Sequence, residues 1–226
     1  MKLILFDCDG TIVDSQHAIV AAMEAAFRLH GLPAPSRAGV VSVVGLSLGE
    51  AVGRLLPAHD TASVHGVAES YKAAFAELRA QPQHEEPLFW GAREAIERLA
   101  ARPGVVLGVA TGKSRRGVDV LLEREGLGPY FATIQTADDH PSKPHPSMIE
   151  RAMSEAGARR ASTVMIGDTV YDVEMARLAD VGALGVTWGY HPPDELVRAG
   201  AHELVGAYSD LEGAVDRILA SREIAS

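Results

Sequence analysis

The sequence predicts an α/β fold, with a Rossmann-like parallel sheet core, helices on both of its faces and an inserted α-helical cap subdomain. Short β-type runs alternate with amphipathic helical segments over most of the chain, which is typical of βαβ units. The stretch from Ser15 to about Pro82 has helical patterns only, although a crossover between parallel strands needs just one helix. We therefore expect residues 1–14 and 83–226 to form the α/β core domain and residues 15–82 the helical cap subdomain.

The elements follow from local patterns. Lys2–Phe6 is a short apolar run, and further strands are expected at 105–110, 132–136, 163–166, 184–187 and 203–205. In the core, helices are expected at 91–101, 114–125, 147–156, 170–179 and 210–219; Gly126 and Gly157 suit left-handed caps. In the insert, an apolar stripe from Ile19 to His30 and segments 48–56 and 62–78 predict helices, with Asp14 and Ser15 as helix caps at its start.

Composition excludes several classes of function. The chain has 226 residues, 47% of them hydrophobic, which is enough for a proper core. A net charge of −9 argues against a broad surface for nucleic acid or anionic lipid. Cys8 is the single cysteine, so an intrachain disulfide is impossible and a cytoplasmic setting is expected. We expect no signal peptide and no membrane span, since the longest other apolar stretch, 39–49, is too short. The sequence does not distinguish a monomer from a homodimer.

The first strand ends in two acids, Asp7 and Asp9, followed by Gly10 and Thr11. Residues i and i+2 of an extended chain point to the same side, so two negative charges share one crevice, while Cys8 points away into packing. Either a cation sits there or the two acids differ in protonation.

Polar residues also follow the other strands, and ligands of open parallel sheets bind beyond the carboxyl ends of the strands. Strand two leads into Thr111-Gly112-Lys113, the loop after strand three carries Lys143, and strand four leads into Asp168 and then Asp172. Carboxylates without cysteine or paired histidine ligands favour a hard cation, and Mg²⁺ is the expected cofactor. A hydroxyl and N–H groups at a helix start can cradle a phosphate, and a lysine adds positive charge.

Four motifs in this order resemble those of the haloacid dehalogenase-like superfamily, and the resemblance covers nearly the whole chain. They are DxDGT at 7–11, Thr-Gly at 111–112, Lys-Pro at 143–144 and GDTxxD at 167–172. The helical insert resembles the cap of the branch that contains phosphoglycolate phosphatases and β-phosphoglucomutases.

The resemblance implies a role for each matching residue. Asp7 would be the nucleophile that forms an aspartyl-phosphate, Asp9 the general acid and base, and Lys143 the bridge between phosphate and nucleophile. Mg²⁺ would be held by Asp7, the carbonyl of Asp9 and Asp168, with Asp172 acting directly or through water. The expected substrate-binding residues are Gly10, Thr11, Thr111, Gly112, Lys113 and, from the cap, Gly45.

Some residues have a simpler interpretation. Lys113, Arg115 and Arg116 are typical of surface charge, although Lys113 can lend its field to the pocket. Arg37 and Arg54 are candidates for binding a substrate carboxylate, but Arg54 can pair with Glu50 on its own helix. The run 188–191 is expected only to flank the crevice.

The leading functional hypothesis is a Mg²⁺-dependent phosphatase acting on a small phosphorylated metabolite, similar to phosphoglycolate. A phosphomutase of the β-phosphoglucomutase type and a pyrophosphatase would use the same core residues, and the sequence leaves them open. A phospho-accepting signalling module, similar to a receiver domain, is the alternative from a different class; the helical insert and Asp9 argue against it.

Overall fold

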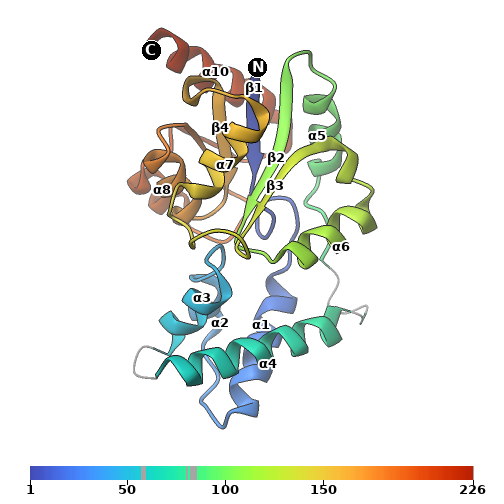
Figure 1. The fold of residues 1–226 in the computed structure, drawn as a ribbon, viewed down its shortest axis with the longest axis vertical. Helices are drawn as coiled ribbons and strands as arrows, with labels where there is room; N and C mark the ends of the chain where they lie inside the picture. The colour runs from blue at the N-terminus through green and yellow to red at the C-terminus, as the bar shows by residue number, and fades with distance from the viewer. Residues whose placement is uncertain (57–59, 80, 82–85, 226) are drawn as a thin grey trace.

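The computed structural model describes residues 1–56, 60–79, 81 and 86–225. Within them lies a six-stranded sheet in the order β3-β2-β1-β4-β5-β6, and all neighbouring strands are parallel (Figure 1). The strands are β1 Lys2–Phe6, β2 Val105–Thr111, β3 Phe131–Thr136, β4 Thr163–Gly167, β5 Gly182–Val186 and β6 Glu203–Val205. The predicted α/β class with a parallel sheet is confirmed, and every predicted strand overlaps an observed one.

Helices cover both faces of the sheet, because side chains of a strand alternate between the faces. Ile4 and Phe6 of β1 belong to one buried apolar cluster, whereas Leu3 and Leu5 belong to another. The first cluster includes residues of α5 Ala92–Ala100, α6 Arg115–Glu125 and α10 Leu211–Ala225; the second includes residues of α7 Ser147–Ala156, α8 Val170–Leu178 and α9 Pro193–Ala199.

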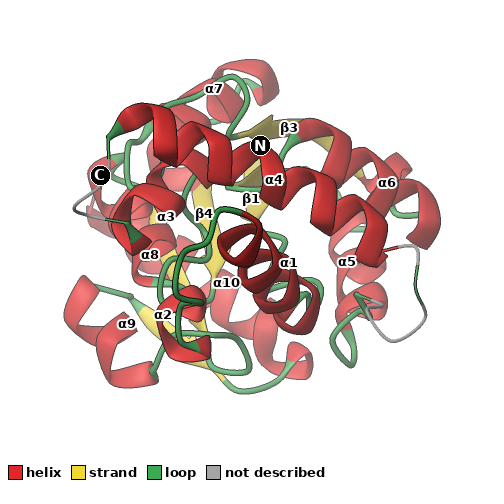
Figure 2. Ribbon diagram, turned by 90° about the horizontal axis from the view of Figure 1, so that it is seen from below, coloured by secondary structure: helices red, strands yellow, loops and turns green. Residues whose placement is uncertain are grey.

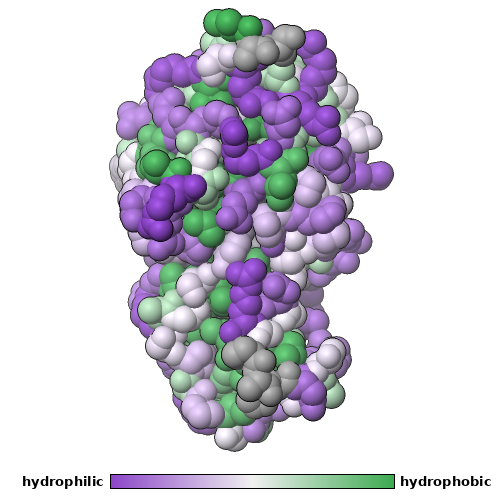
Figure 3. All heavy atoms as spheres, turned by 90° about the vertical axis from the view of Figure 1, so that its left-hand side faces the viewer, coloured by the Kyte–Doolittle hydropathy of each residue, from purple (hydrophilic) through white to green (hydrophobic). Residues whose placement is uncertain are grey.

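Between β1 and α5, the described residues form four inserted helices: α1 Gln16–Leu29, α2 Arg37–Val41, α3 Leu48–Leu55 and α4 Thr61–Arg79. They lie beyond the carboxyl ends of the strands, and Figure 2 shows α1 and α4 side by side in front of the sheet. Figure 3 shows a constriction of the surface between this part and the rest. Met23, Phe27, Val40 and Val52 are among the residues of a separate apolar cluster that holds these helices together.

The division of the chain into a core and a cap therefore has a physical basis in separate apolar clusters, and its stated boundaries remain a prediction. The expected boundary between residues 82 and 83 lies outside the described residues. Two helices were not expected from the sequence, α2 and α9, and α10 extends beyond its predicted end at 219.

The chain leaves β1 toward β2 on one side and returns to β4 on the other. β1 is therefore the point at which the strand order reverses, where an open α/β sheet forms a crevice for ligands. The carboxyl ends of β1 and β4 open toward the four inserted helices (Figure 1).

Candidate active site

Three acids from two strand ends meet at this crevice. Asp7 follows β1, Asp168 follows β4, and Asp172 lies in the first turn of α8. One carboxylate oxygen from each lies within 4.8 Å of the others, and all three residues are at most 1% exposed. Three buried carboxylates at this separation repel one another, so the arrangement needs positive charge or bound protons.

Lys143, in the loop between β3 and α7, supplies part of that charge. Its Nζ lies 2.6 Å from Asp172 Oδ1 and 3.1 Å from Asp7 Oδ1, and its side chain is fully buried. Burial alone would lower the pKa of Lys143, but the carboxylates of Asp172 and Asp7 raise it above its usual value. The lysine is therefore a permanent cation between two of the three acids.

Asp7 has one oxygen with partners and one without. Oδ1 accepts the N–H of Cys8 at 2.7 Å, whereas Oδ2 is buried and accepts no hydrogen bond from the described residues. Burial raises the pKa of Asp7 to about 7, against the lowering effect of Lys143. A buried carboxylate oxygen without a partner is costly, and a bound cation would remove that cost.

Asp168 is held by donors from both ends of the chain. It accepts the hydroxyl of Thr11 at 2.8 Å and the backbone N–H of Tyr190 at 2.9 Å. Burial, followed by the charges of Asp172 and Asp7, raises the pKa of Asp168 well above its usual value. Gly10 permits the close packing here: its φ is +86°, and a Cβ on it would lie 2.1 Å from an Asp168 oxygen.

Asp172 also closes the start of α8. Its Oδ2 accepts the N–H of Thr169 at 3.1 Å and its hydroxyl at 2.7 Å, while Oδ1 binds Lys143. The capping role and a place in the acid cluster are therefore compatible, because each oxygen faces a different partner.

Asp9 stands apart from these acids and faces the inserted helices. Its Oδ1 accepts a hydrogen bond from the Ser15 hydroxyl and lies 2.8 Å from Lys113 Nζ. Lys113 also lies 2.8 Å from Glu86 Oε1, and its side chain is 7% exposed. The interpretation of Lys113 as surface charge is therefore wrong, because two acids bring its ammonium group into the interior. Burial alone would lower the pKa of Lys113, but Asp9 and Glu86 raise it.

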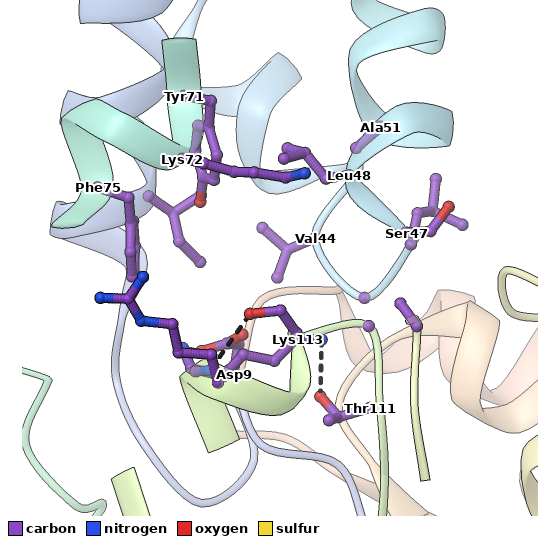
Figure 4. A pocket seen from close by; sticks show the side chains of 18 of the residues that line it. Asp9, Val44, Ser47, Leu48, Ala51, Tyr71, Lys72, Phe75, Thr111 and Lys113 are labelled. Carbon is purple, nitrogen blue, oxygen red and sulfur yellow. Dashed lines mark hydrogen bonds and ion pairs between the residues drawn. The ribbon is translucent and has the colours of Figure 1, made fainter. Parts of the chain in front are cut away.

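Thr111, Gly112 and Gly45 come together where the inserted helices approach the sheet. The Thr111 hydroxyl accepts the N–H of Lys113 at 3.2 Å and lowers the pKa of Asp7. A Cβ on Gly112 would lie 2.5 Å from the Gly45 carbonyl oxygen, so this approach depends on glycine. All three residues line a cavity of about 850 Å³ that also contains Asp7 and Asp9 (Figure 4).

The remaining predicted positions lie elsewhere or have other partners. The hydroxyl of Thr11 is engaged by Asp168, and its carbonyl accepts from Trp188 and Tyr208. Arg54 pairs with Glu50, as the simpler interpretation expected, and Arg37 binds Gln16. Neither arginine lines the cavity.

Sequence reasoning missed three contributors to the site: Glu86, Arg79 and the backbone of Tyr190. Glu86 is fully buried and pairs with Arg79 of α4 at 2.9 Å as well as with Lys113. Tyr190 follows β5 at the same edge of the sheet as the other motifs, which is the signal that could have located it. Its contact with Asp168 is made by a backbone N–H group, so the identity of the side chain at this position gives no signal for it.

Among the described residues, no helix combines the length and the apolar character that crossing a lipid bilayer requires.

Comparisons with known proteins agree with the motifs and the geometry. The family profile described as haloacid dehalogenase-like hydrolase matches residues 4–186. A relative named "Probable phosphatase IndB", from Dickeya dadantii (strain 3937), is 39% identical over 221 residues, which are 96% of this chain and 94% of the relative. A protein named phosphoglycolate phosphatase, from Vibrio parahaemolyticus serotype O3:K6 (strain RIMD 2210633), is 28% identical over 93% of this chain and 94% of its own.

The fold gives the same result. The crystal structure of a hydrolase from Pseudomonas syringae superimposes with a TM-score of 0.85 at 26% identity, covering 96% of this chain and 99% of that one. The family profile extends from within β1 to the end of β5 and includes all four motifs. This chain is thus a phosphoric monoester hydrolase, and it belongs to the haloacid dehalogenase-like hydrolases.

Proposed function

We propose that this protein is a Mg²⁺-dependent phosphatase that hydrolyses a small phosphate monoester through an aspartyl-phosphate on Asp7. The observation that carries the proposal is the buried, partnerless Oδ2 of Asp7 beside Asp168, Asp172 and Lys143. Three acids with one lysine leave excess negative charge, and the donor set consists of oxygen atoms only, which fits a hard divalent cation.

Asp7, Asp168 and the carbonyl of Asp9 would hold the cation, with Asp172 acting directly or through water. Bound there, Mg²⁺ would withdraw charge from the phosphoryl oxygens and favour the ionised form of Asp7. Thr111 and the N–H of Gly112, at the start of the segment that leads into α6, would hold phosphoryl oxygens. Lys143 would reduce the repulsion between the Asp7 carboxylate and the anionic substrate.

The reaction would proceed in two displacements at phosphorus. In the first, an oxygen of Asp7 attacks phosphorus, the ester P–O bond breaks, and Asp9 donates a proton to the leaving oxygen. In the second, Asp9 takes a proton from water, the water oxygen attacks phosphorus, and the bond between Asp7 and phosphorus breaks. The proton on Asp9 is thereby restored, and phosphate and the alcohol are the products.

Ser15 and Lys113 would support these proton transfers by fixing the Asp9 carboxylate at the floor of the cavity. The position matters because a general acid must lie within hydrogen-bond reach of the leaving oxygen. Asp9 lies on the side of the inserted helices, where the alcohol part of the ester would be bound, so the leaving oxygen would face it.

The test is phosphate release from acetyl phosphate and from a panel of phosphorylated metabolites that includes phosphoglycolate, pyrophosphate and β-glucose 1-phosphate. We expect repeated turnover with Mg²⁺, loss of turnover with a chelator, and loss in Asp7→Asn. Asp119→Asn is the matched control, because Asp119 lies in an exposed ion pair with Arg115 on α6. Mass spectrometry of a quenched reaction should find one phosphoryl group on the peptide that contains Asp7.

Each alternative has its own signature in this test. Stoichiometric phosphorylation without turnover would replace the proposal with a signalling role. Conversion of β-glucose 1-phosphate to its 6-phosphate without release of phosphate would replace it with a mutase. Full activity of Asp7→Asn would refute the covalent mechanism.

A further inference from the structure

We propose that the substrate's leaving group carries a planar unsaturated ring that lies against Phe75 and Tyr71 of α4. The inference rests on the proposed function and deepens it by naming the class of alcohol that is released. The phosphoryl site itself is common to all phosphate esters, so the identity of the alcohol depends on what lines the cavity beyond Asp9.

The cavity is larger than a short alcohol needs. Its volume of about 850 Å³ is in the range of roughly 300–1,000 Å³ that sites for drug-sized ligands occupy. The polar groups lie at its floor, where Asp9 and Thr111 face the phosphoryl site (Figure 4). The walls formed by the inserted helices are apolar and include Ile19, Met23, Val44 and Leu48.

The aromatic rings begin next to the proposed general acid. Lys113 Nζ lies 2.8 Å from Asp9 Oδ1 and 5.3 Å from the centroid of the Phe75 ring. The aromatic surface continues to Tyr71, which stacks on Phe75: the two ring centroids are 5.6 Å apart and the interplanar angle is 25°. Figure 4 shows both side chains on α4 on one side of the pocket, opposite Val44 and Leu48. A leaving oxygen that receives a proton from Asp9 would therefore place its substituent along these rings.

The charges around the cavity do not favour a short acidic alcohol. Lys72 pairs with Glu69, and Lys113 and Arg79 are committed to buried acids. Arg116 is exposed, lines the cavity and has no ion pair or hydrogen bond with a described residue. A short carboxylate would have to use the exposed Arg116 or displace Glu69 from Lys72, whereas a planar ring gains from the apolar walls and the aromatic face.

The experiment compares esters whose leaving alkoxides have similar basicity: benzyl phosphate, cyclohexylmethyl phosphate, ethyl phosphate and phosphoglycolate. We expect kcat/KM for benzyl phosphate to exceed that for ethyl phosphate about tenfold or more. The value of kcat/KM for benzyl phosphate should also exceed that for cyclohexylmethyl phosphate, which is similar in size but not planar, about threefold or more. Equal values for the ring and the two-carbon esters would overturn the inference.

Variants assign the preference to the rings. Phe75→Leu and Tyr71→Leu should each lower the ratio of benzyl to cyclohexylmethyl turnover about threefold, because they retain apolar bulk and remove the flat face. Glu77→Gln, on an exposed position of α4 outside the cavity, should leave the ratio unchanged. An unchanged ratio in both leucine variants would contradict the proposal. It would also be contradicted if the wild-type protein preferred phosphoglycolate to benzyl phosphate and Arg116→Ala lost turnover of phosphoglycolate.

Binding to the wild-type protein separates this inference from the proposed chemistry. Benzylphosphonate, which cannot be hydrolysed, should bind about tenfold more tightly than ethylphosphonate in calorimetric titrations with Mg²⁺. If neither acetyl phosphate nor any of the esters is turned over, the proposed function fails, and the titration still decides whether the ring binds. If all esters are turned over and the two phosphonates bind with equal affinity, the proposed phosphatase activity stands and the proposed preference for a planar ring is refuted.

Discussion

Lys113 and Asp9 form a buried ion pair, with 2.8 Å between Nζ and Oδ1. Lys113 is also paired with Glu86, and Glu86 Oε2 lies 2.9 Å from Arg79 Nε on α4 without an aligned hydrogen bond. A chain of ion pairs thus connects an inserted helix to the residue that we propose as general acid and base. The position of Asp9 depends on this chain of ion pairs, because Lys113, Glu86 and Arg79 come from three separate segments.

Glu86→Gln tests that dependence. The amide keeps the size of the side chain and removes the charge that holds Lys113, so Lys113 and Asp9 should shift. We expect kcat to fall about ten- to hundredfold, since a displacement of about 1 Å at a catalytic group can cost that much. Steady-state kinetics with acetyl phosphate measures it, with the exposed Glu123→Gln on α6 as control. A folded Glu86→Gln protein with wild-type kcat would contradict the positioning role.

The raised pKa of Asp7 predicts how the stability of the metal-free protein depends on pH. Its pKa is raised from 3.8 to about 7, chiefly by burial, so the folded state binds this proton more tightly than the unfolded state. Stability from this group is therefore lost as pH rises from about 4 to about 7 and is constant above that. We expect Asp7→Asn to raise Tm at about pH 8 and to have a much smaller effect at about pH 4.

The comparison with Asp7→Asn is needed because other groups change in the same range. Burial lowers the pKa of His191, which makes the folded state more stable as pH rises toward the usual histidine value. Thermal unfolding of both proteins in the presence of chelator isolates the contribution of Asp7, and Asp119→Asn controls for the substitution. A difference in Tm that is independent of pH would show that the acid is ionised throughout.

Asp168→Asn should weaken Mg²⁺ binding by at least about ten- to hundredfold, the range seen when even an indirect partner of a metal ligand is lost. The reason is that Asp168 shares the three-acid cluster with Asp7 and Asp172. In the wild-type protein, Mg²⁺ should raise Tm, and more so at about pH 8 than at about pH 5, because Asp7 and Asp168 must lose protons to bind it. Calorimetric titration gives the affinity, and equal affinities would exclude Asp168 as a ligand.

The sheet could be predicted because each strand carries a strong local signal and parallel strands must bring their carboxyl ends together. The residues Asp7, Lys143 and Asp168, far apart in sequence, were expected to meet for that reason. α2 could not be predicted, since Arg37–Val41 is short and contains glycine and two valines, which favour other conformations. The end of α10 is polar, and Arg222 within it binds Asp180, a tertiary contact without a local pattern.

The partners of the site residues were harder to predict than the residues themselves. Ser15 was expected to cap a helix; it occupies the N-cap position of α1, but its hydroxyl binds Asp9 in place of the helix. Glu86 precedes α5 without any periodic pattern, so its link to Lys113 depends on how the inserted helices fold back onto the sheet. Such contacts are set by tertiary packing, which the order of residues along one segment does not encode.

Gly112→Ala tests whether close contact between the inserted helices and the sheet is needed for activity. A Cβ there would lie 2.5 Å from the Gly45 carbonyl oxygen and 2.6 Å from that of Leu46, so the loop before α3 must move away from Thr111. We expect kcat/KM to fall about tenfold or more, because the loop helps to close the cavity over the phosphoryl site.

The matched control is Gly53→Ala in α3, where a Cβ would meet nothing within 4 Å. Alanine is the better helix former, so this change should stabilise the protein by up to about 1 kcal/mol and leave kcat/KM unchanged. Thermal unfolding and steady-state kinetics on both variants separate the two effects. Wild-type kinetics in Gly112→Ala would mean that the approach of Gly45 to the strand end has no part in the reaction, since the added methyl group cannot fit without separating them.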